Sequence, residues 1–164
     1  MERIYLGLGT NLGDKLKNLS HSRLLIADHI APISNASAIY TTAAWGVEDQ
    51  DSYLNQVVQI ETNLAPLDLL AQVLEIEQMM GRERRLKWGA RVIDIDILFY
   101  GSQILETEHL IIPHPFLQER NFVLIPMAEL TPEFKHPISN LSMQTLKRNS
   151  KDLLKVEVFL GEEE

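Results

Sequence analysis

The segment VIDIDILF, residues 92–99, constrains the fold more than any other part of the chain. It is apolar enough to form a buried strand, yet it carries Asp94 and Asp96. Because strand side chains alternate between faces, both carboxylates point to one face and the intervening isoleucines to the other. Two carboxylates roughly 7 Å apart repel each other and are costly to desolvate. A nearby cation makes the pair tolerable, and oxygen ligands favour a hard ion such as Mg²⁺.

A basic segment directly precedes this strand. Residues 82–91 read RERRLKWGAR, with five basic side chains and one glutamate, a net charge of +4. Taken alone, a short D-x-D pattern is compatible with aspartates that face solvent, and a charged run is compatible with a solvated loop. Together they favour an anion site, in which arginines bind phosphates and carboxylates hold the metal that bridges those phosphates.

Composition and charge exclude several classes of protein. A chain of 164 residues predicts a single domain over 1–164, long enough to bury its own core. No apolar stretch approaches the roughly 20 residues of a membrane span. The chain has no cysteine, which is compatible with the cytoplasm, where we expect it. The net charge of −8 argues against nucleic-acid and anionic-membrane partners.

The hydrophobic pattern predicts alternating strands and helices. Strands are expected at 4–8, 37–41, 53–60 and 92–99, a turn at 9–14, and helices over 16–30 and 66–80. The order β-α-β-β-α-β matches the ferredoxin-like split βαβ arrangement and predicts the α+β class. Residues 150–164 are expected to add an edge strand, where 155–160 alternate, and a frayed acidic tail.

Further residues suit a nucleotide site only when taken together. Pro113-His114-Pro115 holds an imidazole stiffly, and Arg120 and Phe122 follow in the segment ERNFVL. Each of these side chains alone is compatible with an ordinary surface or core position. The glycine-rich residues 7–13 lack the lysine of a phosphate-binding P-loop, so any phosphates must be held by arginines and metal ions.

Four motifs, in this order, span most of the chain. They are Gly9-Thr10-Asn11-Leu12-Gly13, Gln50-Asp51-Ser52-Tyr53-Leu54-Asn55, Trp88-Gly89-Ala90-Arg91-Val92-Ile93-Asp94-Ile95-Asp96-Ile97, and Pro113-His114-Pro115 with Arg120-Asn121-Phe122-Val123-Leu124. The set resembles the 6-hydroxymethyl-7,8-dihydropterin pyrophosphokinase family of folate biosynthesis, and the motif with two aspartates is the most specific. Ala90 departs from that family's pattern, where a proline is usual.

The resemblance implies an activity and a fold. It implies transfer of pyrophosphate from ATP to the hydroxymethyl group of 6-hydroxymethyl-7,8-dihydropterin, with release of AMP. It also implies two Mg²⁺ ions and a three-layer α-β-α sandwich around the ferredoxin-like βαββαβ core, with a mostly antiparallel sheet. We expect a monomer whose partners are these two small substrates.

The resemblance also implies a role for each candidate residue. Asp94 and Asp96 would hold the metal ions, and Arg82 and Arg91 would be catalytic. The residues expected at ATP are Glu77, Arg82, Arg84, Trp88, Arg91, Ile97, His109, Ile111, His114 and Arg120. The residues expected at the pterin are Thr42, Ala43, Trp45, Tyr53, Asn55, Asp94 and Phe122. His109 and Ile111 stand where some members of that family have an arginine and a threonine.

Two other classes remain open from the sequence. One is a non-catalytic nucleotide or metal sensor on a ferredoxin-like sheet, and the other is an RNA-binding domain, which the net charge of −8 disfavours.

For the enzyme, the self-repelling charge of residues 82–91 predicts a loop that is mobile when empty and orders when both substrates bind.

Overall fold

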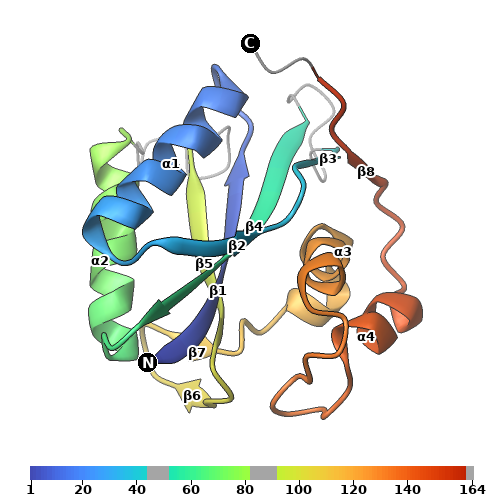
Figure 1. Ribbon diagram of the computed structural model, residues 1–164. Helices are drawn as coiled ribbons and strands as arrows, with labels where there is room; N and C mark the ends of the chain where they lie inside the picture. The colour runs from blue at the N-terminus through green and yellow to red at the C-terminus, as the bar shows by residue number, and fades with distance from the viewer. Residues whose placement is uncertain (44–51, 82–91, 162–164) are drawn as a thin grey trace.

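The computed structural model describes residues 1–43, 52–81 and 92–161, which form three layers (Figure 1). In chain order the elements are β1 (Glu2–Thr10), α1 (Lys15–His29), β2 (Ile33–Ala36), β3 (Tyr40–Thr42), β4 (Tyr53–Thr62), α2 (Pro66–Met79), β5 (Asp94–Tyr100), β6 (Leu105–Glu106), β7 (Ile111–Ile112), the 3-10 helix η2 (Leu117–Glu119), α3 (Asn121–Leu130), α4 (Met143–Asn149) and β8 (Val156–Val158). Among these, no helix is long and apolar enough to cross a bilayer.

The main sheet is antiparallel throughout the described residues. Its order is β5-β1-β4-β3-β8, and β2 pairs with β4 beside β3. β6 and β7 form a separate hairpin. The α+β class and the predicted edge strand are therefore confirmed, since β8 lies on the outer side of β3.

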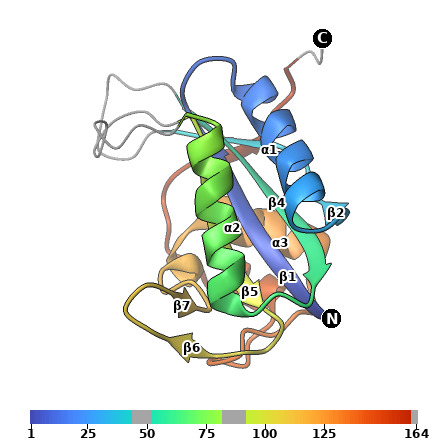
Figure 2. The same cartoon turned by 90° about the vertical axis from the view of Figure 1, so that its left-hand side faces the viewer.

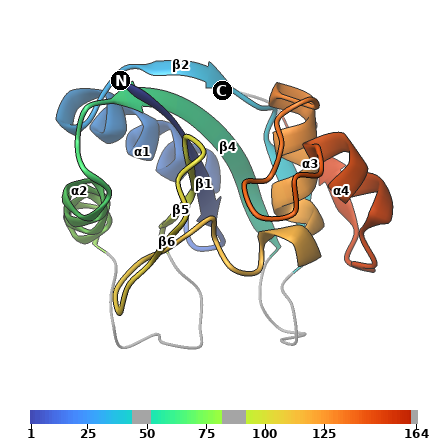
Figure 3. The same ribbon diagram turned by 90° about the horizontal axis from the view of Figure 1, so that it is seen from below.

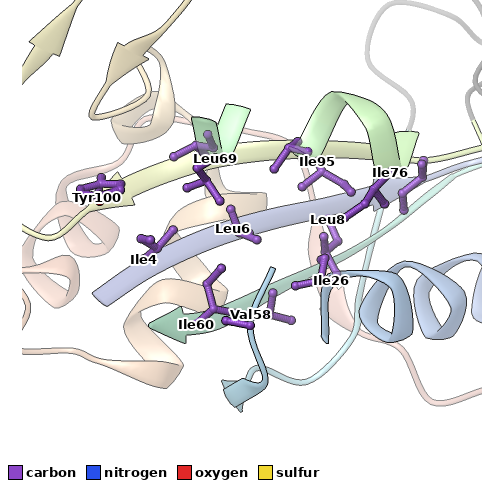
Figure 4. Packing of buried hydrophobic residues seen from close by; sticks show 14 of the residues in the cluster. Ile4, Leu6, Leu8, Ile26, Val58, Ile60, Leu69, Ile76, Ile95 and Tyr100 are labelled. Carbon is purple, nitrogen blue, oxygen red and sulfur yellow. The ribbon is translucent and has the colours of Figure 1, made fainter. Parts of the chain in front are cut away.

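The two faces of the sheet are covered by different helices. Figures 2 and 3 show α1 and α2 on one face and α3 and α4 on the other. Toward α1 and α2, Ile4, Leu6 and Leu8 of β1 join Ile95 and Ile97 of β5 in one apolar cluster (Figure 4). Toward α3 and α4 a second cluster forms, which includes Tyr5, Leu98, Phe99, Leu124 and Met127. Strand alternation thus builds two cores from the same strands.

Capping and turn residues set the ends of α1 and α2. Asp14 caps α1 by accepting a hydrogen bond from Lys17 N at 3.2 Å. Pro66 occupies the first turn of α2, and Gly81 follows the helix with a φ of +82°, a conformation that glycine adopts without a Cβ clash. The helix expected over 66–80 therefore forms nearly as predicted.

Two strand predictions were wrong in detail. Of the strand expected at 37–41, only Tyr40 and Thr41 lie in a strand, β3, and the strand β2 that precedes it was not predicted. Residues 37–39 leave the ladder, where the Ser37 hydroxyl accepts from Val57 N at 3.0 Å. Beyond it, Ala38 N donates to Glu129 Oε2 at 3.0 Å instead of to β4. The turn expected from Gly9 begins later, because pairing on both sides of β1 keeps Gly9 in the strand and β1 ends only at Thr10.

Candidate active site

Two rows of residues cross the sheet at one end of β1. In the first row, Gly9 lies opposite Asp94 of β5 on one side and Asn55 of β4 on the other. In the second row, Gly7 lies opposite Asp96 and Val57 in the same way. Since directly paired residues share a face, each glycine separates an aspartate from a β4 side chain.

The two glycines leave β1 without side chains on the face that it shares with Asn55 and the aspartates. A Cβ added to Gly9 would lie 3.1 Å from Asn55 Nδ2, and one added to Gly7 would lie 3.4 Å from the Leu98 methyls. The leucines that alternate with these glycines, Leu6 and Leu8, are buried on the opposite face. Backbone of β1 therefore forms a floor between the carboxylates and Asn55.

A cavity of about 380 Å³ lies over this floor and reaches α3; we call it the α3-side cavity. Thr42 and Ala43, at the end of β3, line it together with Asn55. Within the described residues, Asn55 Oδ1 and Thr42 Oγ1 are buried and have no hydrogen-bond partner. Buried polar atoms without partners are costly, so this cavity suits a ligand with polar edges.

Aromatic and cationic side chains line the α3-side cavity as well. Tyr53 stands at the start of β4, and Phe122 stands in the first turn of α3. Arg120 also lines the cavity, and its guanidinium carbon lies 5.7 Å from the centre of the Phe122 ring and 5.4 Å from that of Phe116. Tyr53 and Phe122 offer flat apolar surface, and the positive charge of Arg120 lies over the rings of Phe116 and Phe122.

A second cavity, of about 440 Å³, lies on the other side of the aspartates; we call it the α2-side cavity. Leu70, Leu74 and Glu77 of α2 line it. Glu77 is only 4% exposed, and its Oε2 accepts a hydrogen bond from Ile95 N at 2.9 Å. Glu77 therefore fixes the outer edge of β5, where both aspartates lie.

Asp94, Asp96 and Tyr53 line both cavities. Asp94 is half-buried and Asp96 is exposed, so both carboxylates remain accessible. Among the described residues no group of three or more potential metal ligands gathers. A pair of carboxylates fits Mg²⁺, which is usually held by one or two carboxylates, with water and phosphate oxygens completing the shell.

His114 lies close enough to Asp96 and Arg120 to feel both charges. Its backbone N donates to Leu98 O at 3.0 Å, which ties it to β5. Burial lowers the pKa of the imidazole; the Asp96 carboxylate raises it, Arg120 lowers it, and the net shift is downward. Phe116 N donates to Nδ1 at 3.4 Å, so a neutral His114 carries its proton on Nε2.

The structure brings only some of the predicted site residues together. Asp94, Asp96, Thr42, Ala43, Tyr53, Asn55, Glu77, Arg120 and Phe122 line the cavities. The side chain of Ile97 is 4% exposed and packs into the core toward α1 and α2, while His109 and Ile111 are exposed and line neither cavity. Trp45, Arg82, Arg84, Trp88 and Arg91 lie outside the described residues, as does the predicted ordering of 82–91.

The sequence interpretation missed several cavity residues. Gly7 and Gly9 carried a readable signal, because they alternate with Leu6 and Leu8 in a period of two. Leu154 also lines the α3-side cavity, and no local pattern marks it.

Comparison with known proteins agrees on one family. Residues 5–132 match the family model described as 7,8-dihydro-6-hydroxymethylpterin-pyrophosphokinase. Two relatives carry the name 2-amino-4-hydroxy-6-hydroxymethyldihydropteridine pyrophosphokinase. That of Aquifex aeolicus is 38% identical over 147 residues, 90% of this chain and 91% of the relative. That of Methylorubrum extorquens is 45% identical over 138 residues, 81% of this chain and 85% of the relative.

A solved structure shares the fold. The wild-type HPPK-DHPS of Plasmodium falciparum is similar to this chain with a TM-score of 0.72 at 17% sequence identity, over 90% of this chain and 44% of that one. This chain therefore spans less than half of the longer protein. With a family model that covers most of its length, the chain belongs to the 7,8-dihydro-6-hydroxymethylpterin-pyrophosphokinase family.

Proposed function

We propose that the two cavities hold the two substrates, the pterin in the α3-side cavity and ATP in the α2-side cavity. The activity itself comes with the family: the chain is a pyrophosphokinase of folate biosynthesis with ATP as co-substrate. One observation carries the assignment of the cavities. Asp94 and Asp96 line both of them, so groups bound on either side meet at the carboxylates.

The α3-side cavity suits a flat heterocycle with polar edges. Its floor is the backbone at Gly7 and Gly9, and Tyr53 and Phe122 offer aromatic surface. Asn55 has both a donor and an acceptor for the ring edge, and its buried Oδ1 has no partner among the described residues. Thr42 contributes a second buried hydroxyl oxygen of this kind.

We assign the nucleotide to the α2-side cavity, where the charged residues among those described are the carboxylates Glu77, Asp94 and Asp96. Positive charge is needed at the phosphates, and the family resemblance assigns it to Arg82, Arg84 and Arg91, with Trp88 beside the nucleotide. Of the described residues, Arg120 and the Nε2 of His114 can donate to phosphate oxygens close to the carboxylates. Glu77 acts indirectly, since it holds Ile95 and thereby both aspartates.

Asp94 and Asp96 fit two Mg²⁺ ions, which would supply charge neutralisation on the triphosphate. The pterin hydroxymethyl oxygen forms a bond to the β-phosphorus and releases its proton to water. The bond from that phosphorus to the α-phosphate oxygen breaks, and AMP leaves. The rigid β5 strand keeps the carboxylates between the two substrates, and the cavity walls orient the hydroxymethyl group toward them.

We further propose that the chain acts as a monomer in the cytoplasm, with no nucleic-acid or membrane partner. The net charge of −8 supports the lack of polyanionic partners, since it repels polyanions. Sedimentation of the chain with both substrates would reveal a dimer if one forms.

The assignment of the cavities is tested by binding each substrate separately. Calorimetry should show that Asn55→Ala weakens pterin binding and leaves MgATP binding unchanged, while Asp96→Asn stops AMP release from ATP and the pterin. Equal losses of both substrates in Asn55→Ala would contradict the assignment, as would normal AMP release by Asp96→Asn.

A further inference from the structure

The C-terminal segment, residues 150–158, lies beyond the part of the chain that matches the family model, which ends at residue 132. Figure 1 shows it running from α4 past α3 to the outer side of β3. It ends as β8, in which Val156 pairs with Thr42 and Val158 pairs with Tyr40. The segment thereby supports the strand that carries Thr42 and Ala43 to the α3-side cavity.

Asp152 joins this segment to the start of α3. Its Oδ2 accepts from Asn121 N at 2.8 Å, and its main-chain oxygen accepts from Asn121 Nδ2 at 3.3 Å. Its Oδ1 accepts from Leu154 N at 3.0 Å. One carboxylate therefore fixes both the first helical N–H of α3 and the backbone of Leu154.

The start of α3 depends on a residue distant in sequence. The N-cap residue, Arg120, makes no side-chain capping bond, so the Asp152 carboxylate takes that place. A carboxylate at a helix N-terminus also interacts favourably with the helix dipole. Arg120 and Phe122, which flank Asn121, both line the α3-side cavity.

Leu154 differs from its neighbours in the segment. Leu153 is 97% exposed, whereas Leu154 is half-buried and lines the α3-side cavity. A leucine held by Asp152 at this place offers apolar surface to any flat ligand on the glycine floor. Its neighbour points into solvent and offers none.

We propose that the C-terminal segment is a wall of the pterin site, in which Leu154 contacts the pterin and Asp152 is a positioning residue for Phe122 and Arg120. This inference rests on the proposed function, which places the pterin in the α3-side cavity. It assigns a role in substrate binding to a part of the chain outside the matched family region.

The contact is tested by a matched pair of leucines. Leu154→Ala should weaken pterin binding roughly tenfold and leave MgATP binding unchanged, because it removes apolar contact from one cavity only. Leu153→Ala should change neither. Calorimetry with each substrate gives both dissociation constants, and circular dichroism confirms that each variant folds. If Leu154→Ala does not fold, Leu154→Phe takes its place: the larger ring narrows the cavity and should selectively weaken pterin binding.

The positioning role of Asp152 is tested by a graded series. Asp152→Asn keeps an oxygen acceptor for the N–H of α3, whereas Asp152→Ala removes it. The KM for the pterin should therefore rise more in the alanine variant than in the asparagine variant, with kcat less affected than KM. A purely structural role would instead lower kcat through loss of folded protein and leave the KM for the pterin unchanged, and that result would overturn this role.

Asn55→Ala separates the two ways in which the account can fail. If Asn55→Ala and Leu154→Ala both leave pterin binding unchanged, the pterin is not in the α3-side cavity and the proposed function of that cavity is wrong. If Asn55→Ala weakens pterin binding while Leu154→Ala binds the pterin as well as Leu153→Ala does, the pterin is in the α3-side cavity but Leu154 does not contact it.

Discussion

The two faces of the central sheet use the same strands for different purposes. On the face toward α1 and α2, Leu6 and Leu8 of β1 meet Ile95 and Ile97 of β5 in a closed apolar core. On the face toward α3 and α4, apolar packing by Tyr5 and Phe99 stops partway along the strands. Beyond that point the residues are small or charged, and the α3-side cavity begins.

This difference separates stability from function at the level of single residues. Burial of aliphatic side chains on the first face supplies folding free energy. On the second face, Gly7, Gly9, Asp94 and Asp96 contribute little burial, and the carboxylates repel each other. Neighbours in sequence should therefore respond in opposite ways to mutation.

The sharpest contrast lies within β5. Asp94→Ala or Asp96→Ala should lower kcat roughly 10²–10³-fold or more, because charge stabilisation in the transition state is lost. Both variants should keep their stability, since removing one carboxylate relieves repulsion. Ile95→Ala, between them, should instead reduce the free energy of unfolding by about 2–5 kcal/mol.

Initial rates of AMP formation and urea unfolding measure the two effects on the same proteins. The proposed separation of stability from function within β5 would be wrong if the aspartate variants unfold as readily as Ile95→Ala, or if both aspartate variants keep near-normal turnover.

A comparison of Asn55 with Gln59, both on β4, tests the role of the second face. Asn55→Ala should weaken pterin binding by roughly 1–3 kcal/mol, because polar atoms of the ring lose their partner. Gln59, further along the same strand, lines neither cavity, and Gln59→Ala should bind the pterin normally. Titration calorimetry measures pterin binding by both variants. Weaker pterin binding by Gln59→Ala would indicate a general effect of β4 on folding.

Gly9→Ala should have a smaller effect on the same site. The new Cβ would lie 3.1 Å from Asn55 Nδ2, so the amide must shift by a few tenths of an ångström. We expect pterin binding to weaken about tenfold at most, a loss of about 1.4 kcal/mol. Gly7→Ala, whose Cβ would meet the Leu98 methyls at 3.4 Å, should lose less. Pterin fluorescence titrations compare the two; a larger loss in Gly7→Ala would contradict the proposed floor.

The smallest expected effect is a change in folding stability with pH, caused by His136 in the core. Burial lowers the pKa of His136 from its ordinary 6.5, so the unfolded chain takes up the proton first as pH falls. Stability is therefore full above pH 6.5 and decreases as pH falls from there through the folded pKa. Nδ1 of His136 accepts from Ile138 N at 3.1 Å, and His136→Asn keeps an acceptor there without the titration.

Melting temperatures of both proteins between pH 8 and 5 reveal the contribution of His136. The wild type should lose more stability over this range than His136→Asn; equal slopes would mean that His136 does not couple to folding. His114 also has a lowered pKa, but it is present in both proteins and cancels in the comparison.

Local periodicity predicted the two helices before residue 81, most of the strands of the main sheet and the carboxylate pair, but not β2, β6, β7, α3 or α4. The alternation around Asp94 and Asp96 and the edge strand near residue 156 are of this kind, and both are present in the structure. Placement that depends on tertiary contacts was not predictable. Leu154 reaches the cavity through a hydrogen bond between Asp152 and Asn121, 31 residues apart.

Glu77 shows a different limit of sequence interpretation. The resemblance placed it near the nucleotide, and it does line the α2-side cavity. Its hydrogen bond to Ile95 N could not be inferred from the sequence, because it depends on how α2 packs against the edge of β5. The second strand was similarly misjudged: residues 37–39 are not in a strand, and Ala38 N instead donates to Glu129, a tertiary contact.

The most direct test of the account is a crystal structure of the chain with the pterin, Mg²⁺ and a non-hydrolysable ATP analogue. We expect the pterin ring on the floor at Gly9, beside Asn55 and Phe122, the triphosphate on the α2 side, and metal density at Asp94 and Asp96. A pterin bound outside the α3-side cavity, or metal ions away from both carboxylates, would contradict it.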